Sequence, residues 1–284
     1  SEEDFSQMAV NYPIILNKSN WIGGSTYVYK FGTSVDMGGV SIALGSASLF
    51  YSWRNITAAK GNNTFSLIHP ATGATNVTLN LTLPDGGYEI SDINDYIKFY
   101  LITNGYYIQN SSTLEYTVYA ELRVNPSTYQ VEFVSYPLPT SLPSGFTAGS
   151  SITFPTSSRG PQLTIGTTGF GTLIGFAIGN FPSSQSSSIT TTGSTLIPVL
   201  TEVQNVVLTL NSAANPYAPN SGIIHAISYA GVAYGKTIVS EPNQLSFVPQ
   251  QSGFRQELRI QLCDQTLKPL ELIDYDVTIK LLLQ

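Results

Sequence analysis

The chain has 284 residues, of which 42% are hydrophobic and only 11% are charged, whereas roughly 25% are charged in an average soluble domain. This length suits one large domain or two of about 140 residues each, and the hydrophobic content excludes a disordered chain. The net charge is −6 and no cluster of Lys and Arg occurs. Direct nucleic-acid binding is therefore not expected, because it needs many basic contacts with phosphates.

A membrane-spanning segment and an intrachain disulfide are also not expected. The longest apolar run, Leu173–Phe181, is much shorter than the roughly 20 residues of a bilayer span. A single cysteine, Cys263, does not form an intrachain disulfide. The acidic start Ser1–Gln7 lacks the basic and then apolar pattern of a signal peptide, and we expect either a cloning remnant or a processed start there.

Short segments in which apolar and polar residues alternate dominate the chain, and this pattern predicts half-buried β-strands. Turn signals such as Pro84-Asp85-Gly86-Gly87 separate them. Before residue 140 the predicted strands are Thr26–Phe31, Val40–Trp53, Phe65–Ile68, Val77–Leu83, Leu114–Val124 and Tyr129–Val134, and the last two form a hairpin.

One short helix is expected in this first half. Apolar side chains recur at helical spacing between Ile93 and Leu101. Ser91 is a suitable N-cap, and Asn104-Gly105 is a stop signal.

The segment Pro137–Pro161 is rich in Pro, Ser, Thr and Gly, which favours neither a strand nor a helix. We expect it to connect two halves, each with the size of a Greek-key sandwich. The sequence therefore predicts an all-β chain with domains at residues 1–140 and 162–284 and a connection at 141–161. The strands predicted in the second half are Gln162–Ile165, Thr172–Ile178, Val203–Leu210, Ile223–Tyr229, Thr237–Val239, Leu245–Val248, Glu257–Cys263 and Asp276–Leu283.

Residues that carry enzyme chemistry are few. The two histidines, His69 and His225, lie at or within predicted strands, and neither belongs to a motif with a nucleophile and an acid. Cys263 follows Leu262 in a strand pattern and is expected to be a buried, inert thiol. We therefore expect a protein that is not an enzyme and has no catalytic residue, with a hydrolase as the least favoured hypothesis.

Two groups of carboxylates have spacings that a cation can use. Asp274 and Asp276 would share one face of a strand, but no glycine-containing calcium loop surrounds them. Asp92 and Asp95, with Asn94 between them, are better explained by the start of the predicted helix. The sequence thus predicts no metal ion and no cofactor.

Two further motifs have functional interpretations. The glycine-rich run Gly166–Gly171 lacks the lysine and the helix start of a phosphate-binding loop, so we expect a turn or bulge. N-glycosylation sequons are expected to be unused in a chain with neither a signal-peptide pattern nor disulfides; they begin at Asn17, Asn55, Asn62, Asn76, Asn80 and Asn110.

The composition of the surface favours contact with other proteins. The chain has 17 Tyr and 13 Phe but few charges, so its surface consists largely of uncharged polar and tyrosine side chains. Such a surface costs little to desolvate and carries few like charges. A monomer with a polar coat is one alternative. A glycan-binding or adhesive sandwich is another, because Trp21 and Trp53 are able to stack on sugars, although we expect both to pack internally.

Several segments resemble capsid proteins of DNA viruses. The end of the chain is similar to the closing strands of viral jelly-roll capsid proteins, and two segments of the first half are similar as well. Over most of residues 12–283 the chain resembles the major capsid proteins of Polinton-like viruses, adintoviruses and virophages. The segments are Leu258–Asp264, the turn Gln265–Pro269, Leu270–Asp274, Val277–Leu283, Leu83–Ile90 and Tyr51–Ile56.

The resemblance implies two tandem jelly rolls in each subunit. Three subunits would form a pseudo-hexameric trimer that packs, with other capsid proteins such as pentons, into an icosahedral shell, so the chain would be located in the virion. Its partners would be copies of itself and other capsid proteins, without direct contact to nucleic acid. At 284 residues the chain is short for a double jelly roll, so a single-jelly-roll penton or minor capsid protein with an insertion stays open as the alternative.

Overall fold

The computed structural model describes residues 10–218 and 222–284. Its contacts divide the chain into two compact units. Unit 1 is made of Ser1–Trp53 and Val203–Gln284, and unit 2 of Arg54–Glu202. Unit 2 is therefore inserted within the sequence of unit 1.

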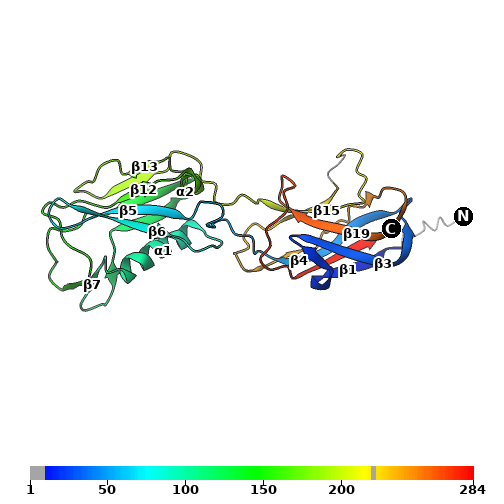
Figure 1. Ribbon diagram of the computed structural model, residues 1–284, viewed down its shortest axis with the longest axis horizontal. Helices are drawn as coiled ribbons and strands as arrows, with labels where there is room; N and C mark the ends of the chain where they lie inside the picture. The colour runs from blue at the N-terminus through cyan, green and yellow to red at the C-terminus, as the bar shows by residue number, and fades with distance from the viewer. Residues whose placement is uncertain (1–9, 219–221) are drawn as a thin grey trace, which may run out of the picture. The chain divides into compact units, whose positions relative to one another are not determined.

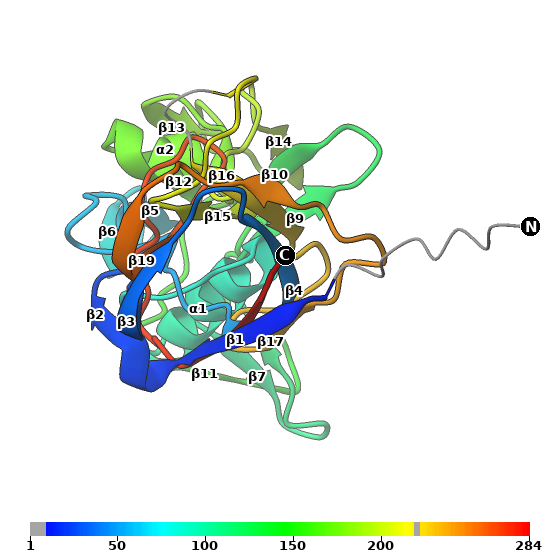
Figure 2. The same cartoon turned by 90° about the vertical axis from the view of Figure 1, so that its right-hand side faces the viewer.

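Unit 1 consists of two antiparallel sheets (Figure 1). Sheet A has the strand order β1–β20–β4–β17, with β18 also paired to β4, and sheet B has the order β16–β15–β19–β3–β2. Figure 2 shows the neighbouring strands β2, β3 and β19 of sheet B. The strands of sheet A are β1 (Tyr12–Asn17), β4 (Ser41–Phe50), β17 (Thr237–Ser240), β18 (Val248–Pro249) and β20 (Val277–Leu283). Those of sheet B are β2 (Trp21–Gly23), β3 (Thr26–Asp36), β15 (Asn205–Leu210), β16 (Ile223–Ser228) and β19 (Phe254–Cys263), and a 3-10 turn, η1 (Lys18–Asn20), precedes β2.

This strand order is that of a jelly roll. The first main strand, β1, pairs with the last, β20, and β3 pairs with β19. Along the chain the eight main strands alternate between sheets A and B, except that β15 and β16 form a hairpin within sheet B. The main strands are β1, β3, β4, β15, β16, β17, β19 and β20, while the short strands β2 and β18 are additional members of sheets B and A. Unit 2 is inserted between β4 and β15, the third and fourth of the eight main strands described.

The core of unit 1 lies between the two sheets and follows the alternation of the sequence. In β19, Leu258, Ile260 and Leu262 are buried, while Arg259 between them is exposed. Val277, Ile279 and Leu281 of β20 and Leu16 of β1 enter the same apolar cluster. Burial of each such side chain contributes about 1.5–3 kcal/mol, so the period-2 pattern that predicts these strands also provides the packing between sheets.

Unit 2 contains three small sheets and two helices. Two of the sheets and both helices share a second apolar core, whereas the sheet of β7, β8 and β11 packs on a smaller cluster that includes Ile108 and Leu138. The sheet orders are β13–β12–β5–β6, β14–β10–β9 and β11–β7–β8, none of which reproduces the order of unit 1. The helices are α1 (Ile90–Thr103) and α2 (Thr168–Ile174). The strands are β5 (Thr64–Pro70), β6 (Asn76–Thr82), β7 (Ile108–Asn110), β8 (Tyr116–Thr117), β9 (Ala120–Asn125), β10 (Gln130–Ser135), β11 (Phe146–Ala148), β12 (Gln162–Ile165), β13 (Gly179–Phe181) and β14 (Thr190–Gly193).

Asn55 joins the beginning and the end of unit 2. Its Nδ2 donates hydrogen bonds to the carbonyl oxygens of Tyr88 at 2.8 Å and Leu200 at 2.9 Å. Its Oδ1 accepts from the backbone N–H of Tyr88 at 2.9 Å. An ion pair of 3.6 Å between Lys60 and Glu202 lies near the same two ends of the insertion. The ends of the insertion are therefore held together by bonds within unit 2 itself.

The all-β prediction is confirmed, but the predicted division at 1–140, 141–161 and 162–284 differs from the division into units. Strands on either side of the expected connection pair with each other within unit 2: Leu67 of β5 pairs with Leu163 of β12. The Pro-rich segment lies inside unit 2, where residues 146–148 form β11. Proline excludes regular structure locally, but it does not identify a domain boundary. The jelly-roll strand order therefore occurs once, split by unit 2, and not twice in tandem.

Three local predictions also need correction. The helix is confirmed but begins at Ile90 with Glu89 as N-cap, whose backbone N–H donates to Asp92 at 2.7 Å, and not with Ser91. Leu114–Val124 is not one strand, because Leu114 adopts a φ of 60° in a turn and residues 118–119 separate β8 from β9. The predicted strand Thr172–Ile178 overlaps helix α2. Ser1–Gln7 lies outside the described residues.

Candidate functional site

The histidines are isolated from each other in the fold, His69 in unit 2 and His225 in unit 1. His69 in β5 is 1% exposed, and its Nδ1 lies 2.9 Å from the carbonyl oxygen of Pro70, to which it donates. Burial lowers the pKa of His69 to about 4. His225 lies in β16, where burial also lowers its pKa. No bond from either ring to a carboxylate or a nucleophile is present within residues 10–218 and 222–284.

Cys263 is the buried thiol that the sequence predicts. It ends β19, and burial raises its pKa, so the reactive thiolate is disfavoured. Its Sγ lies 3.8 Å from Oε1 of Gln261.

The two predicted carboxylate pairs are structural. Asp274 Oδ1 accepts the backbone N–H of Asp276 at 2.9 Å in the turn before β20. Asp92 accepts the N-cap N–H of α1, Asp95 is exposed on that helix, and Asn94 Oδ1 accepts the N–H of Leu122 at 2.8 Å. Across the part of the chain that is described, no group of three His, Cys, Asp or Glu residues is arranged to hold a metal ion.

The glycine-rich run serves close packing. Helix α2 begins at Thr168 within it, which the sequence did not predict. A Cβ on Gly169 would lie 2.5 Å from the carbonyl oxygen of Gly61, and one on Gly171 would lie 2.4 Å from that of Phe176. The glycines are therefore needed where two backbones approach.

Trp53 packs internally, as expected, whereas Trp21 is half-buried. Trp53 is 5% exposed and lies in an aromatic cluster with Tyr51 and Tyr229, at centroid distances of 4.7 and 5.1 Å. Trp21 stacks on Tyr275 at 4.0 Å with an interplanar angle of 14°. Neither arrangement resembles a free aromatic platform for a sugar, so the tryptophans do not support the glycan-binding alternative.

Two of the six sequons are in positions where the asparagine amide is already engaged. Asn62 is buried and donates to the carbonyl oxygen of Asn55, and Asn55 makes the three bonds described above. Asn17 is exposed but accepts from Ser19 at the start of η1. That the exposed sequons, for example at Asn76, are unused stays a prediction.

The outer face of sheet A carries very little charge. Its side chains alternate with core residues such as Leu16 and Ile279 and form three rows across the paired strands. Lys280 is the single charged residue of these rows, and Ile15 and Val239 are more than half exposed. The rows are Asn17–Thr278–Ser48–Val239, Ile15–Lys280–Ser46 and Pro13–Leu282–Ala43.

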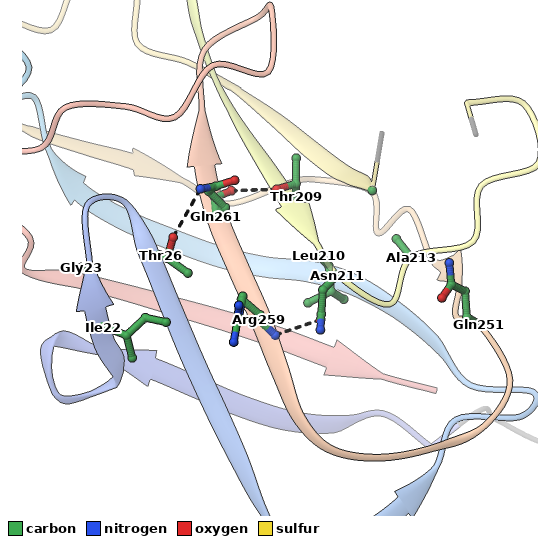
Figure 3. Close-up of a pocket in the computed structure, with 11 residues that line it drawn as sticks. Ile22, Gly23, Thr26, Thr209, Leu210, Asn211, Ala213, Gln251, Arg259 and Gln261 are labelled. Carbon is green, nitrogen blue, oxygen red and sulfur yellow. Dashed lines mark hydrogen bonds between the residues drawn. The ribbon is translucent and has the colours of Figure 1, made fainter. Parts of the chain in front are cut away.

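The outer face of sheet B contains a polar groove of about 620 Å³ (Figure 3). On its floor Gln261 Nε2 donates to Thr26 Oγ1 at 3.4 Å, and Thr209 Oγ1 donates to the Gln261 carbonyl oxygen at 3.3 Å. Beside them the backbone N–H of Arg259 donates to Asn211 Oδ1 at 2.9 Å. The Arg259 guanidinium lies 3.2 Å from the carboxylate of Glu257. The groove thus has a wide, mostly uncharged floor with one neutralised cation.

These two faces form the candidate functional site, and the sequence indicated only their composition. They lie on opposite sides of the jelly roll, because each is the side of its sheet that points away from the core. No helix within the described residues is long and apolar enough to cross a bilayer.

Comparisons with known proteins give only distant likenesses. No family model and no curated protein matches the chain. It is similar to the crystal structure of the mavirus penton protein, with a TM-score of 0.41 and 9% identity over 97% of this chain and 99% of that chain. It is also similar to a chain in the 3.5 Å cryo-EM structure of the Sputnik virophage, with a TM-score of 0.37 and 11% identity over 96% of this chain and 97% of that chain. At such scores neither likeness adds to the fold that the strand order defines.

Proposed function

We propose that the chain is a structural protein of a virus capsid, located in the virion, which assembles with other copies through the two outer faces of unit 1. The observation that carries the proposal is the strand order of unit 1. Jelly rolls of this order serve as capsid subunits, lectins and cupins. A cupin site would occupy the space between the sheets, which in unit 1 is filled by an apolar core.

Among these roles of jelly rolls, the composition of the outer faces of unit 1 favours assembly into a capsid. Burying the face of sheet A desolvates one charged group, the ammonium of Lys280, and a few short polar side chains beside aliphatic residues such as Ile15 and Val239. The short polar side chains are Asn17, Ser46, Ser48 and Thr278. A face of this kind loses little hydration energy, while each buried aliphatic side chain contributes favourably. Contacts between unlike faces, sheet A of one copy on sheet B of the next, close into a ring when the rotation between copies is suitable.

Of the capsid roles, we infer the single-jelly-roll penton or minor capsid role. A pseudo-hexameric trimer needs two similar wedges in each subunit. The strand order supports one wedge, because the sheets of unit 2 have a different order. The acidic balance of the chain supports a role in which other proteins contact the genome.

The test is the mass of the purified protein in solution, measured by size-exclusion chromatography with light scattering over a range of concentrations. We expect closed oligomers, and pentamers in particular. Ile15→Glu and Val239→Glu place a charge on the face of sheet A and should weaken association at least tenfold, on the order of 2 kcal/mol for a central contact. Phe99→Glu, on an exposed position of α1 in unit 2, is the matched control.

Two outcomes contradict the proposal in different ways. A protein that stays monomeric at the highest soluble concentration contradicts assembly. A stable trimer contradicts the penton role and favours the trimeric capsomer that the sequence resemblance implies.

A further inference from the structure

Unit 2 contains a second hollow, in a different place from the assembly faces. It has a volume of about 500 Å³ and lies between helix α1 and the interrupted strand that forms β8 and β9. Its lining combines aromatic, charged and amide side chains. The lining residues are Asn94, Lys98, the segment 116–121 and Tyr136.

One wall of the hollow contains a tyrosine ring that contacts a second tyrosine ring. Tyr116 is 43% exposed, and its ring meets that of Tyr107 edge to face, at 4.8 Å and 81°. An edge-to-face contact of this geometry restricts the motion of the ring, and the exposed part of Tyr116 stays accessible to a ligand. An exposed aromatic face with restricted motion is suited to the apolar C–H face of a flat, ring-shaped ligand.

The hollow also contains polar groups, some of which are held by hydrogen bonds. The Tyr136 hydroxyl donates to Glu121 Oε2 at 2.6 Å, which orients the carboxylate. Asn94 is held by the bond that its Oδ1 accepts from Leu122. Its amide nitrogen and the ammonium of Lys98 make no bond with any described residue, so both are available as donors.

The charges of the lining select the class of ligand. The lining contains one carboxylate, that of Glu121, and one ammonium group, that of Lys98, so its formal charges sum to zero. A cation would therefore meet an ammonium group and an anion would meet a carboxylate. A wholly apolar ligand would leave the carboxylate, the ammonium and the amide without partners. A neutral ligand with one apolar face and several hydroxyl groups satisfies both the ring and the polar groups.

We propose that this hollow, which Tyr116, Glu121 and Lys98 line, binds a neutral saccharide. The ring of Tyr116 stacks on one face of the sugar. Glu121 accepts hydrogen bonds from sugar hydroxyls, and Lys98 and Asn94 donate to them. Unit 2 would in this way give the protein a carbohydrate-binding surface separate from the faces through which unit 1 assembles.

The experiment is saturation-transfer-difference NMR on the full chain with single neutral sugars, namely glucose, galactose, mannose and N-acetylglucosamine. We expect transfer to at least one of them. Tyr116→Ala should weaken that binding at least tenfold, whereas Tyr116→Phe, which keeps the ring, should change it less than threefold. Glu121→Gln keeps the acceptor for Tyr136 but removes the charge, and it should also weaken binding. Tyr129→Ala is the control, because Tyr129 is 84% exposed at a turn of the same unit.

The proposal is overturned if none of the four sugars receives saturation at millimolar concentration. It is equally overturned if Tyr116→Ala binds as well as the unaltered chain, or if phosphocholine or sialic acid binds at this hollow in preference to the neutral sugars. Circular dichroism of each variant separates loss of binding from loss of fold. Because assembly is measured by mass and involves unit 1, either proposal can fail while the other stands.

Discussion

The buried histidine of unit 2 makes that unit sensitive to mild acid. The ring of His69 packs against that of Tyr106 at a centroid distance of 5.1 Å, and its Nε2 has no hydrogen-bond partner among the described residues. Protonation would place an imidazolium in this buried position without a carboxylate beside it. The folded protein therefore resists protonation, and burial lowers the pKa of His69 from 6.5 to about 4.

The sign and size of the effect follow from this difference. In the unfolded chain His69 takes up a proton as the pH falls through about 6.5, but in the folded chain it does so only near pH 4. The free energy of unfolding is thus highest above the unfolded pKa and decreases as the pH falls toward the folded pKa. The whole difference in pKa corresponds to about 3 kcal/mol, of which about 2 kcal/mol is lost between about pH 7 and pH 5.

His69→Phe tests this reasoning, because phenylalanine keeps a ring beside Tyr106 and does not titrate. Urea unfolding of both proteins is followed at pH 7 and pH 5 by hydrogen exchange of β5 peptides. Between pH 7 and pH 5 the free energy of unfolding should decrease by about 2 kcal/mol more in the unaltered chain than in the variant. Trp21 and Trp53 both belong to unit 1, so tryptophan fluorescence provides an internal control that should not differ between the two proteins. Equal losses in both proteins would refute the assignment of this acid sensitivity to His69.

Three further changes test the packing. Asn55→Ala removes three hydrogen bonds and should lower the free energy of unfolding of unit 2 by about 3 kcal/mol, measured by hydrogen exchange. A change below about 0.5 kcal/mol would contradict the role of Asn55 in joining the ends of the insertion. Gly171→Ala forces a Cβ against a carbonyl oxygen and should destabilise unit 2 by about 1–3 kcal/mol, whereas Gly166→Ala, with nothing within 4 Å, should be nearly neutral in the same urea titration. Trp53→Ala should destabilise unit 1 by about 3–5 kcal/mol, measured by calorimetry. Trp21→Ala should destabilise it clearly less, because Trp21 is only half-buried. Equal effects of the two substitutions would argue against Trp53 as a core residue.

The predictability of the fold depended on the range of the interactions involved. The strands β3, β4, β15, β19 and β20 were predicted because their alternation is local and matches a single buried face. Local pairing was predictable, since β9 and β10 form the hairpin that the sequence predicts. Long-range pairing was not, because β1 pairs with β20 over nearly the whole length of the chain. The insertion was not predicted for this reason, since nothing in the composition marks the two points, after Trp53 and before Val203, at which the chain passes from one unit to the other.

Errors in local structure have similar causes. Helix α2 contains two glycines, which lower helix propensity, and it is stabilised by burial of Phe170, Leu173 and Ile174 in the core of unit 2. Alternation before Tyr116 was misleading, because Leu114 is exposed in a turn.

The candidate sites were only partly predictable. The scarcity of charge indicated contact surfaces, but not which faces, because the outward rows of sheet A are defined only by strand register. The hollow in unit 2 combines α1 with β8, β9 and Tyr136, which are brought together by tertiary packing. Its best sequence signal, the tyrosines at 116, 119 and 136, is not distinguishable from an ordinary strand pattern.

The most direct test of the account is single-particle cryo-EM of the assembled protein. We expect closed rings in which the jelly rolls of neighbouring copies contact each other through the outer faces of sheets A and B, with Ile15 and Val239 buried at the contacts. Particles that are single chains, or rings held together by unit 2 while both faces of unit 1 stay exposed to solvent, would contradict the account.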